Sequence, residues 1–428
     1  MKINCFIPFQ SVSQVKETIL SLKESELVNK IYLLKENDNQ ETIEGCDILD
    51  IDTLRSTATI KKIASKADAE YTLIYTKSAS LRLGMFALDR MLQIAADSGA
   101  GMVYADHYQI ANNEKKNSPV ITYQKGSLRD DFNFGSVLIY KSDSLKKAVA
   151  DMETEYKFAG IYDLRLKVSQ ESEIVHINEY LYTEIENDTR KSGEKVFDYV
   201  DPKNREVQIE MEKACTEHLK KIGAYLAPNF RKVEFDQVNF EYEASVIIPV
   251  RNRIKTISDA IKSVLSQKTN FKFNLIIVDN YSTDGTTEAI DKFTDERLIH
   301  VIPENKELGI GGCWNAGVHH PKCGKFAVQL DSDDVYSDEN TLQKIVDAFY
   351  EQNCAMVVGT YMLTDFDMKM IPPGIIDHKE WTPDNGRNNA LRINGLGAPR
   401  AFYTPVLREI KVPNTSYGED YALGLHFS

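Results

Sequence analysis

The sequence predicts an α/β protein in which two Rossmann-like, mostly parallel sheets are joined by a helical connector. Three observations predict this class. A strand–helix–strand pattern occurs near the N-terminus and again after residue 243. Each copy continues with a further strand, an amphipathic helix and another strand. A polar segment separates the copies, so we divide the chain into residues 1–186, 187–243 and 244–428.

The first copy contains apolar runs of strand length at residues 3–9, 31–34, 71–75 and 101–104. Amphipathic helical patterns follow the first and third runs. Their apolar faces consist of Val15, Ile19 and Leu22 in the first helix, and of Leu88, Met91, Leu92 and Ala95 in the second. Strands and helices alternating at this spacing predict βαβ units and a parallel sheet.

The second copy repeats this layout with strand-like runs at residues 244–250, 275–278, 326–330 and 355–358. Its two helices carry the apolar faces Ile257, Ile261, Val264, Leu265 and Leu342, Ile345, Val346, Phe349. The correspondence in order and spacing predicts a structural duplication.

The connector is expected to be a loop at residues 187–195 followed by a charged helix at residues 204–226. One side of that helix is apolar and holds Val207, Met211, Ala214, Cys215, Leu219 and Ile222. The stripe predicts packing against one or both domains. A solvated spacer helix is the alternative.

Composition narrows the class of protein. The chain has 428 residues, too many for one ordinary core, and its net charge of −13 argues against a nucleic-acid partner. No apolar run is long enough to span a membrane, and the N-terminus lacks the pattern of a secretory signal. The six cysteines show no CxxC spacing and predict reduced thiols, and adjacent His319 and His320 are poorly placed to share a metal. We expect a cytoplasmic protein. Peripheral association with the inner face of the membrane is compatible with these features.

An acidic cluster follows the strand-like run at residues 326–330. Asp331, Asp333 and Asp334 place three carboxylates within four residues. Such crowding is tolerable in water or around a divalent cation held by oxygen ligands. Because ligands of α/β sheets bind at the carboxyl ends of strands, the pattern favours a metal-assisted site for a phosphorylated substrate. A solvated acidic turn is the competing interpretation.

Asp279 ends another strand and begins a turn rich in Ser, Thr, Asp and Gly at residues 280–286. A carboxylate there can accept the N–H of a pyrimidine ring, and the turn offers caps for a following helix. A calcium loop using Asn280, Ser282, Asp284, Gly285 and Asp291 is the less favoured alternative, because a strand precedes it and its last ligand is Asp.

Gly309, Gly311 and Gly312 precede a helix that contains Asn315. Glycines in this position allow close backbone approach and can leave N–H groups facing a phosphate.

Taken together, these segments resemble family 2 glycosyltransferases of the GT-A type over residues 244–428. The first half resembles a divergent relative of the same fold. The motifs that carry the resemblance are Ser245-Val246-Ile247-Ile248-Pro249-Val250-Arg251-Asn252-Arg253, Val278-Asp279-Asn280-Tyr281-Ser282-Thr283-Asp284-Gly285-Thr286, Asn315-Ala316-Gly317, Asp331-Ser332-Asp333-Asp334 and Gly418-Glu419-Asp420.

The resemblance implies an inverting transfer of a sugar from a nucleotide diphosphate, usually a UDP-sugar, to a glycan or lipid-linked acceptor. It assigns nucleotide-sugar binding to Pro249, Arg251, Asp279, Asn280, Asn315 and Asp331. Asp333, with Asp331, would hold Mn²⁺ or Mg²⁺, and the cation would offset charge on the departing diphosphate. Asp420 would be the general base that deprotonates the acceptor hydroxyl. An acidic pair at a helix N-terminus is the structural alternative for Glu419-Asp420.

The sequence departs from the family pattern in several places. Arg251 replaces an aromatic residue, and the second copy ends soon after Asp420, so we expect it to be truncated. In the first copy, Thr76-Lys77-Ser78-Ala79 and Lys35 replace the acidic cluster and Asp279, while Asp163 matches Asp420. The first copy is therefore expected to be a scaffold, an acceptor-binding module or a decayed enzyme. The alternatives for the whole chain are a nucleotide-sugar pyrophosphorylase, whose glycine-rich signature is absent, and a non-catalytic nucleotide-sugar or glycan-binding protein.

Overall fold

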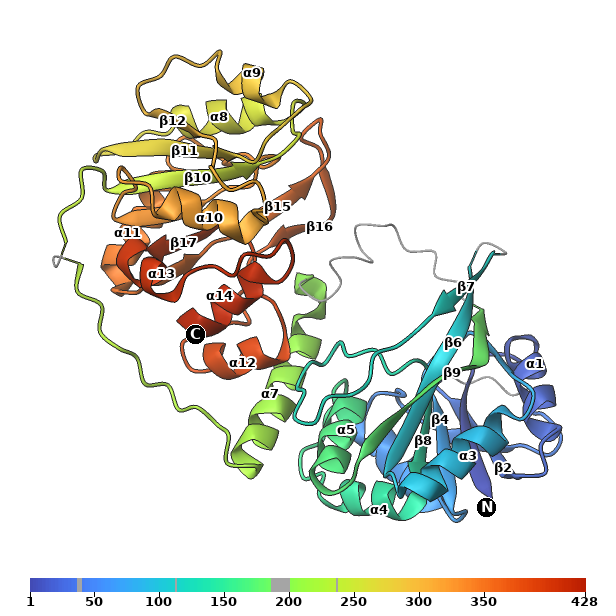
Figure 1. Cartoon of the computed structure of the whole chain (residues 1–428). Coiled ribbons are helices and arrows are strands. Elements are labelled where there is room, and N and C mark those ends of the chain that lie inside the picture. The colour runs from blue at the N-terminus through green and yellow to red at the C-terminus, as the bar shows by residue number, and fades with distance from the viewer. Residues whose placement is uncertain (37–40, 112–113, 186–200, 236–237) are drawn as a thin grey trace. The chain divides into compact units, whose positions relative to one another are not determined.

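A computed structural model describes residues 1–36, 41–111, 114–185, 201–235 and 238–428. The chain divides into two compact units (Figure 1). The N-terminal unit comprises Met1–Lys195 and Lys203–Leu226, and the C-terminal unit comprises Val196–Pro202 and Ala227–Ser428. Each unit has its own sheet and its own core.

The described residues of the N-terminal unit form a nine-stranded sheet in the order β3-β2-β1-β4-β8-β6-β9-β5, with β7 paired to β6. Its strands are β1 (Ile3–Phe9), β2 (Val28–Lys35), β3 (Asp47–Asp50), β4 (Tyr71–Tyr75), β5 (Ser80–Leu83), β6 (Met102–Ala111), β7 (Glu114–Ser118), β8 (Val137–Lys141) and β9 (Ile174–Ile185). Its helices are α1 (Val12–Lys23), α2 (Thr57–Lys66), α3 (Ala87–Ser98), α4 (Ser142–Ala150), α5 (Gly160–Glu171) and α7 (Arg205–Lys221), the last preceded by a 3-10 turn at Pro202–Asn204.

The described residues of the C-terminal unit form a six-stranded sheet in the order β12-β11-β10-β13-β17-β14 and a separate hairpin of β15 and β16. The strands are β10 (Ala244–Val250), β11 (Phe273–Asp279), β12 (Leu298–Val301), β13 (Phe326–Gln329), β14 (Met356–Val358), β15 (Tyr361–Thr364), β16 (Met370–Ile376) and β17 (Arg400–Tyr403). The helices are α8 (Ile257–Leu265), α9 (Thr286–Ile290), α10 (Ile310–Val318), α11 (Thr341–Gln352), α12 (Gly386–Arg392), α13 (Thr404–Ile410) and α14 (Glu419–Phe427).

The two sheets share one topology. The order β3-β2-β1-β4-β8-β6 in the first unit corresponds to β12-β11-β10-β13-β17-β14 in the second. In both, the first four strands are parallel. The fifth strand is antiparallel to both of its neighbours, so the sixth runs in the same direction as the first four. The predicted fold class, an α/β protein with two GT-A-like domains, is confirmed.

The helices of the C-terminal unit bury the faces that the sequence predicts. On α11, the buried positions are the four predicted apolar residues Leu342, Ile345, Val346 and Phe349. Helices α8, α9 and α11 contribute to one core cluster with one face of the sheet, and α10 packs against the other face. The carboxyl ends of β10, β11 and β13 therefore open between two helical layers, where α/β sheets bind ligands.

Helix α7 is part of the N-terminal unit. Ala214, Cys215 and Leu219 of its apolar stripe are buried, whereas Ile222 is exposed. Glu217 accepts hydrogen bonds from the hydroxyls of Thr154 and Tyr156. The helix therefore packs along its stripe, as the sequence predicts, and belongs to a domain. The predicted loop at residues 187–195 lies outside the described residues.

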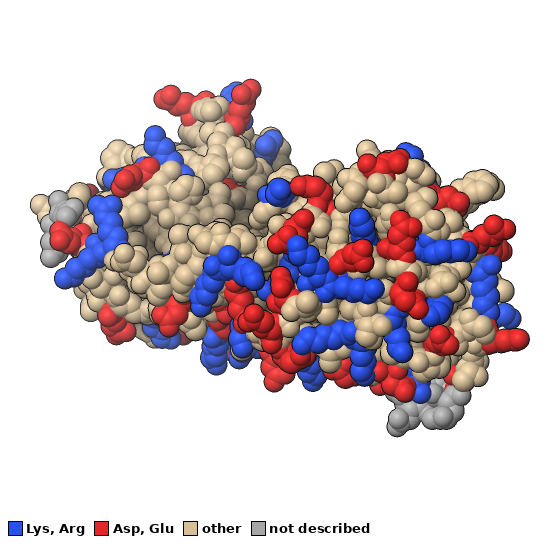
Figure 2. Space-filling view, turned by 90° about the horizontal axis from the view of Figure 1, so that it is seen from below, with Lys and Arg blue, Asp and Glu red and all other residues tan. Residues whose placement is uncertain are grey.

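Within the described part of the chain, no helix is both long and apolar enough to cross a membrane. None of the six cysteines, all of which lie in the described part of the chain, forms a disulfide. On the face shown in Figure 2, Lys and Arg side chains are interspersed with Asp and Glu side chains. That face therefore carries no extended field of a single sign.

Candidate active site

Arg400 joins the two acidic segments of the C-terminal unit. It begins β17, which pairs antiparallel with β13 so that Ala401 lies opposite Val328. Its guanidinium donates to Gln329 Oε1 at 2.7 Å and to Asp420 Oδ2 at 2.9 Å. Gln329 ends β13, and Asp420 lies in the first turn of α14. One arginine thus fixes the strand end before the acidic cluster to the helix that carries the predicted base.

The carboxylates that follow β13 lie in a crowded region that still opens to solvent. The side chains of Asp331 and Asp334 are exposed on one side. Surrounding protein raises the pKa of Asp331, against the opposing charge of Arg400 and with contributions from Asp333 and Asp420. It raises the pKa of Asp334 to about 6, and the carboxylates of Asp331 and Asp333 add to this effect. Asp331, Asp333 and Asp420 therefore share one electrostatic environment.

Arg253 is a site residue to which sequence reasoning assigned no role. Its Nε lies 3.6 Å from Asp333 Oδ2, and the two side chains are 49% and 47% exposed. Arg253 follows β10, whose carboxyl end lies beside that of β13. The signal available in the sequence was a basic residue directly after β10, because the carboxyl end of that strand lies beside the strand that leads into the acidic cluster.

The acidic cluster fits a metal site in which the substrate supplies the remaining ligands. Among the described residues, no three His, Cys, Asp or Glu side chains converge as ligands. Mg²⁺ is usually held by one or two carboxylates together with substrate phosphates and water, so Asp331 and Asp333 supply a suitable donor set. The Nδ1 atoms of His319 and His320 contact different backbone groups, Asn315 O and Lys322 N.

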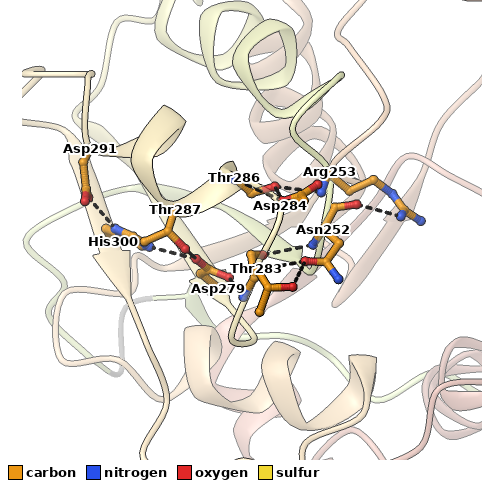
Figure 3. A network of polar contacts seen from close by, with 10 residues as sticks. Asn252, Arg253, Asp279, Thr283, Asp284, Thr286, Thr287, Asp291 and His300 are labelled. Carbon is orange, nitrogen blue, oxygen red and sulfur yellow. Dashed lines mark hydrogen bonds and ion pairs between the residues drawn. The ribbon is translucent and has the colours of Figure 1, made fainter.

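Asp279, at the end of β11, is completely buried. Its Oδ1 accepts the backbone N–H of Ser282 at 3.0 Å, and its Oδ2 accepts the hydroxyl of Thr287 on α9 (Figure 3). Both oxygens thus accept hydrogen bonds within the protein, and the predicted bond from a base N–H would use a further lone pair of this carboxylate. Asp279 therefore organises the turn that follows β11.

The loop after β10 and the turn after β11 are bonded to each other (Figure 3). Asn252 N donates to Ser282 Oγ at 3.0 Å, and Asn252 Oδ1 accepts from Thr283 N at 2.8 Å. Ile254 N donates to Asp284 Oδ2 at 3.1 Å, while Asp284 Oδ1 caps the start of α9. These bonds use Ser282 and Asp284, two of the side chains that the calcium-loop alternative requires as ligands.

Three other predicted nucleotide-binding residues surround the same strand ends. Pro249 is half-buried in β10 opposite Val278, and Arg251 is exposed just beyond that strand. Asn280 Nδ2 donates to Leu308 O at 2.8 Å. Asn280 Oδ1 is buried and has no hydrogen-bond partner among the described residues. Since Nδ2 fixes the amide, Oδ1 is an oriented acceptor without a donor.

The glycines at the start of α10 contact another part of the chain. Gly309 N donates to Asn414 Oδ1 at 2.9 Å, and Gly311 N donates to Thr415 O at 3.0 Å. A Cβ atom on Gly311 would lie only 1.8 Å from Pro413 O. The prediction that these N–H groups face a phosphate is therefore wrong for both residues, and the glycines allow a close approach of the loop at residues 412–415.

Asn315 holds the same loop. Its Nδ2 donates to Val412 O at 2.6 Å, and its Oδ1 accepts from Val412 N at 3.0 Å. Gly317 lets α10 approach the sheet, because a Cβ atom there would lie 2.6 Å from Ile247 Cγ2. In contrast to the prediction that Asn315 binds the nucleotide sugar, this motif uses its polar and small residues for packing.

A small pocket adjoins the acidic end of α14. It is lined by Trp314, Gln329, Phe402, Leu407, Val412, Glu419, Asp420 and Leu423. Within the described residues, Trp314 Nε1 and Glu419 Oε2 are buried without hydrogen-bond partners. Burial raises the pKa of Glu419, and the neighbouring Asp420 adds to the rise. Unpartnered polar atoms beside an indole and a partly exposed carboxylate suit a ligand with hydroxyl groups.

The equivalent sheet edge of the N-terminal unit is closed by a side chain of that unit. After β4, Lys77 forms an ion pair with the buried Glu184 of β9. Asp163 on α5 has a side chain only 2% exposed, and Lys167 Nζ lies 3.8 Å from its Oδ1. The N-terminal unit therefore buries its counterpart of Asp420 and places a cation where the C-terminal unit has carboxylates.

We expect Asp163→Asn to stabilise the N-terminal unit at pH 8 by about 1–3 kcal/mol and to have little effect at pH 4. Burial raises the pKa of Asp163 to about 6, so the folded unit holds this proton more tightly than the unfolded chain. The stability that protonation contributes is complete below about pH 4 and is lost as the pH rises through 6. Thermal unfolding at the two pH values measures the effect.

The exposed Asp47 provides the control, because Asp47→Asn changes the same charge at the surface. Equal stabilisation by Asp163→Asn at both pH values, or none at pH 8, would contradict the assignment.

A sheet of four parallel strands extended by an antiparallel strand and then by a sixth strand antiparallel to that one, with carboxylates after β13 and at the start of α14, defines the class of GT-A glycosyltransferases. Residues 245–402 match the family model described as glycosyl transferase family 2. UDP-Glc:alpha-D-GlcNAc-diphosphoundecaprenol beta-1,3-glucosyltransferase WfaP of Escherichia coli is 38% identical over 186 residues, which are 42% of this chain and 68% of the relative. The chain therefore belongs to glycosyltransferase family 2.

Other relatives are covered less completely. The enzyme of the same printed activity, WfgD of Escherichia coli, is 31% identical over 28% of this chain and 46% of its own length. A Bacillus subtilis relative named for teichuronic acid biosynthesis is 30% identical over 36% of this chain and 60% of its own length. Among solved structures, S. aureus TarS 1-349 in complex with UDP-GlcNAc is similar, with a TM-score of 0.34, 22% identity, and coverage of 43% of this chain and 53% of TarS 1-349.

Proposed function

We propose that this chain is an inverting glycosyltransferase that moves a sugar from a UDP-sugar to a glycan or lipid-linked acceptor in polysaccharide biosynthesis. The observation that carries the proposal is the bridge made by Arg400. It places the carboxylates that follow β13 and the Asp420 carboxylate in one electrostatic environment. Donor activation and acceptor deprotonation require acidic groups on two sides of one sugar, and this arrangement supplies both.

The donor end lies over β10, β11 and β13. Arg251 and Pro249 border the base, and the unpartnered Asn280 Oδ1 accepts its imide N–H. Asp331 faces the ribose, and Asp333 with Asp331 would hold Mn²⁺ or Mg²⁺. When bound, the cation would supply charge neutralisation for the departing diphosphate. Arg253, now paired with Asp333, is close enough to contact a phosphate as well.

The acceptor end lies at α14. Arg400 orients Asp420 through Oδ2, and the backbone N–H of Tyr421 donates to Oδ1 at 2.7 Å. The side chain of Asp420 is 29% exposed, so an acceptor hydroxyl can reach it. Asp420 takes the hydroxyl proton as the oxygen attacks the anomeric carbon, and the bond to the diphosphate breaks on the opposite side. Attack from one side with departure from the other inverts the anomeric configuration.

The relatives support the choice of substrates. The printed names of WfaP and WfgD specify a UDP-glucose donor and an acceptor linked to diphosphoundecaprenol. An acceptor carried by such a lipid would place the reaction at the cytoplasmic face of a membrane. The identity of the donor sugar is the part of the proposal that a screen must decide.

The test measures UDP released from a panel of UDP-sugars with Mn²⁺ and a diphosphoundecaprenol-linked sugar acceptor. We expect release that depends on acceptor and stops when EDTA removes the metal. Calorimetric titration with UDP and Mn²⁺ runs in parallel. Heat without turnover would favour the non-catalytic nucleotide-sugar-binding alternative, and neither heat nor release with any sugar nucleotide would refute both.

A further inference from the structure

His300 lies between two carboxylates at the nucleotide end of the C-terminal unit (Figure 3). Its Nδ1 is 3.0 Å from Asp291 Oδ1, and its Nε2 is 3.6 Å from Asp279 Oδ2. The imidazole side chain is 16% exposed, whereas that of Asp279 is 1% exposed. The partly buried ring therefore connects a surface carboxylate to a buried one.

The sheet explains why these side chains meet. His300 lies on the edge strand β12, opposite Ile277 of β11. Asp279 is two residues beyond Ile277, so its side chain points to the same face of the sheet. Helix α9 packs on this face, where Thr287 on its first turn donates to Asp279 Oδ2 and Asp291 follows its last residue. The strand register and the position of α9 together place Asp291, His300 and Asp279 in a row.

A buried carboxylate needs compensation for its charge. The hydrogen bonds from Ser282 N and Thr287 Oγ1 supply part of it. Within the part of the chain that the structure describes, His300 is the basic side chain found within 4.0 Å of Asp279. It is therefore the group able to bring a positive charge to this carboxylate.

The hydrogen bond to Asp291 determines what His300 offers to Asp279. A carboxylate accepts, so Nδ1 carries a proton in that bond. A neutral ring would then present the lone pair of Nε2 to Asp279 Oδ2, and Nε2 has no hydrogen-bond partner among the described residues.

We propose that His300, held by Asp291, is a positioning residue for donor binding. It holds Asp279, and Asp279 through Ser282 N holds the turn that presents Asn280 to the base. This inference rests on the proposed function, because the role that it assigns to His300 is in the binding of a uridine nucleotide. His300 itself touches neither the donor nor the reacting atoms.

The test compares His300→Gln, Asp279→Asn and the double variant in calorimetric titrations with UDP and Mn²⁺, and in steady-state kinetics. We expect His300→Gln to weaken UDP binding about tenfold and to raise the donor KM by a similar factor with kcat nearly unchanged. The double variant should bind UDP no more weakly than Asp279→Asn, because His300 acts through that carboxylate. His300→Lys should recover part of the affinity by returning a cation to the site.

The matched control is His319→Gln, which removes an exposed histidine from α10 of the same unit. A double-mutant cycle on the free energy of unfolding shows whether His300 and Asp279 interact in the absence of donor. Coupling in stability with unchanged UDP affinity would reduce His300 to a structural residue and overturn the inference. Additive effects of the two substitutions on UDP affinity would also overturn it. Failure of the wild type to bind UDP would instead refute the proposed function, and the donor role of His300 with it.

Discussion

Asp420→Asn is expected to reduce sugar transfer by about 10²–10⁴-fold while UDP binding in the presence of Mn²⁺ stays unchanged. The carboxylate is the proposed acceptor of the hydroxyl proton, and Asn cannot take that proton. Asn keeps an oxygen that can accept the hydrogen bond from Arg400 Nη1, so the hydrogen bond between β17 and α14 is retained. Rate measurements at saturating donor and acceptor, together with UDP calorimetry, separate the chemical step from donor binding.

The neighbouring carboxylate supplies a matched control for this experiment. Glu419 lies in the same helical turn and lines the same pocket, and its buried Oε2 lacks a partner among the described residues. If Asp420 is the base, Glu419→Gln should reduce the rate of sugar transfer much less than Asp420→Asn does. The opposite order of effects would move the base to Glu419, and equal turnover by Asp420→Asn and the wild type would remove the assignment of Asp420.

Asp333→Asn is expected to reduce UDP affinity in Mn²⁺ to the value that the wild type shows in EDTA. The substitution removes the charged oxygen that would join the cation to the strand end, and an amide is a much weaker ligand for a hard cation. The fold should persist, because the ion pair of Asp333 with Arg253 is about half exposed and exposed pairs contribute about 0–1 kcal/mol. UDP titrations with Mn²⁺ and with EDTA measure the effect, and thermal unfolding checks the fold.

The control for Asp333→Asn is Asp338→Asn, a charge-equivalent change in the following loop. Asp338 pairs with Lys344 beside α11, away from the strand ends that form the donor site. Its substitution should leave metal-dependent UDP binding intact. If Asp333→Asn retained wild-type affinity in Mn²⁺, the metal role of the acidic cluster would be refuted.

Periodicity in the sequence predicted helices and strands of both units well. The apolar spacing of α11 and α3 identifies the buried face of each helix, since burial repeats with the helical period. Runs of branched apolar residues likewise predict β10 and β11, which are almost wholly buried. These features depend on residues near one another in the chain.

Side-chain assignments in the site depended on contacts that periodicity does not encode. Asn315 and Gly311 resemble ligand-binding residues in their local pattern, but the loop at residues 412–415 occupies their polar groups. Asp279 ends a strand as the prediction requires, yet α9 and β12 cover its carboxylate. Each of these partners is distant in sequence from the residue it contacts or lies on a separate element.

The sequence by itself determined the duplicated α/β architecture, the strand ends where α/β sheets bind ligands and the acidic residues at Asp331, Asp333 and Asp420. Tertiary structure alone decided that Arg400 joins Gln329, at the end of β13, to Asp420, that Arg253 pairs with Asp333 and that His300 faces Asp279. The physical reason is that burial follows the local repeat of a helix or strand, whereas charge pairing and hydrogen bonding follow distances between separate strands. Those distances are set when the sheet assembles.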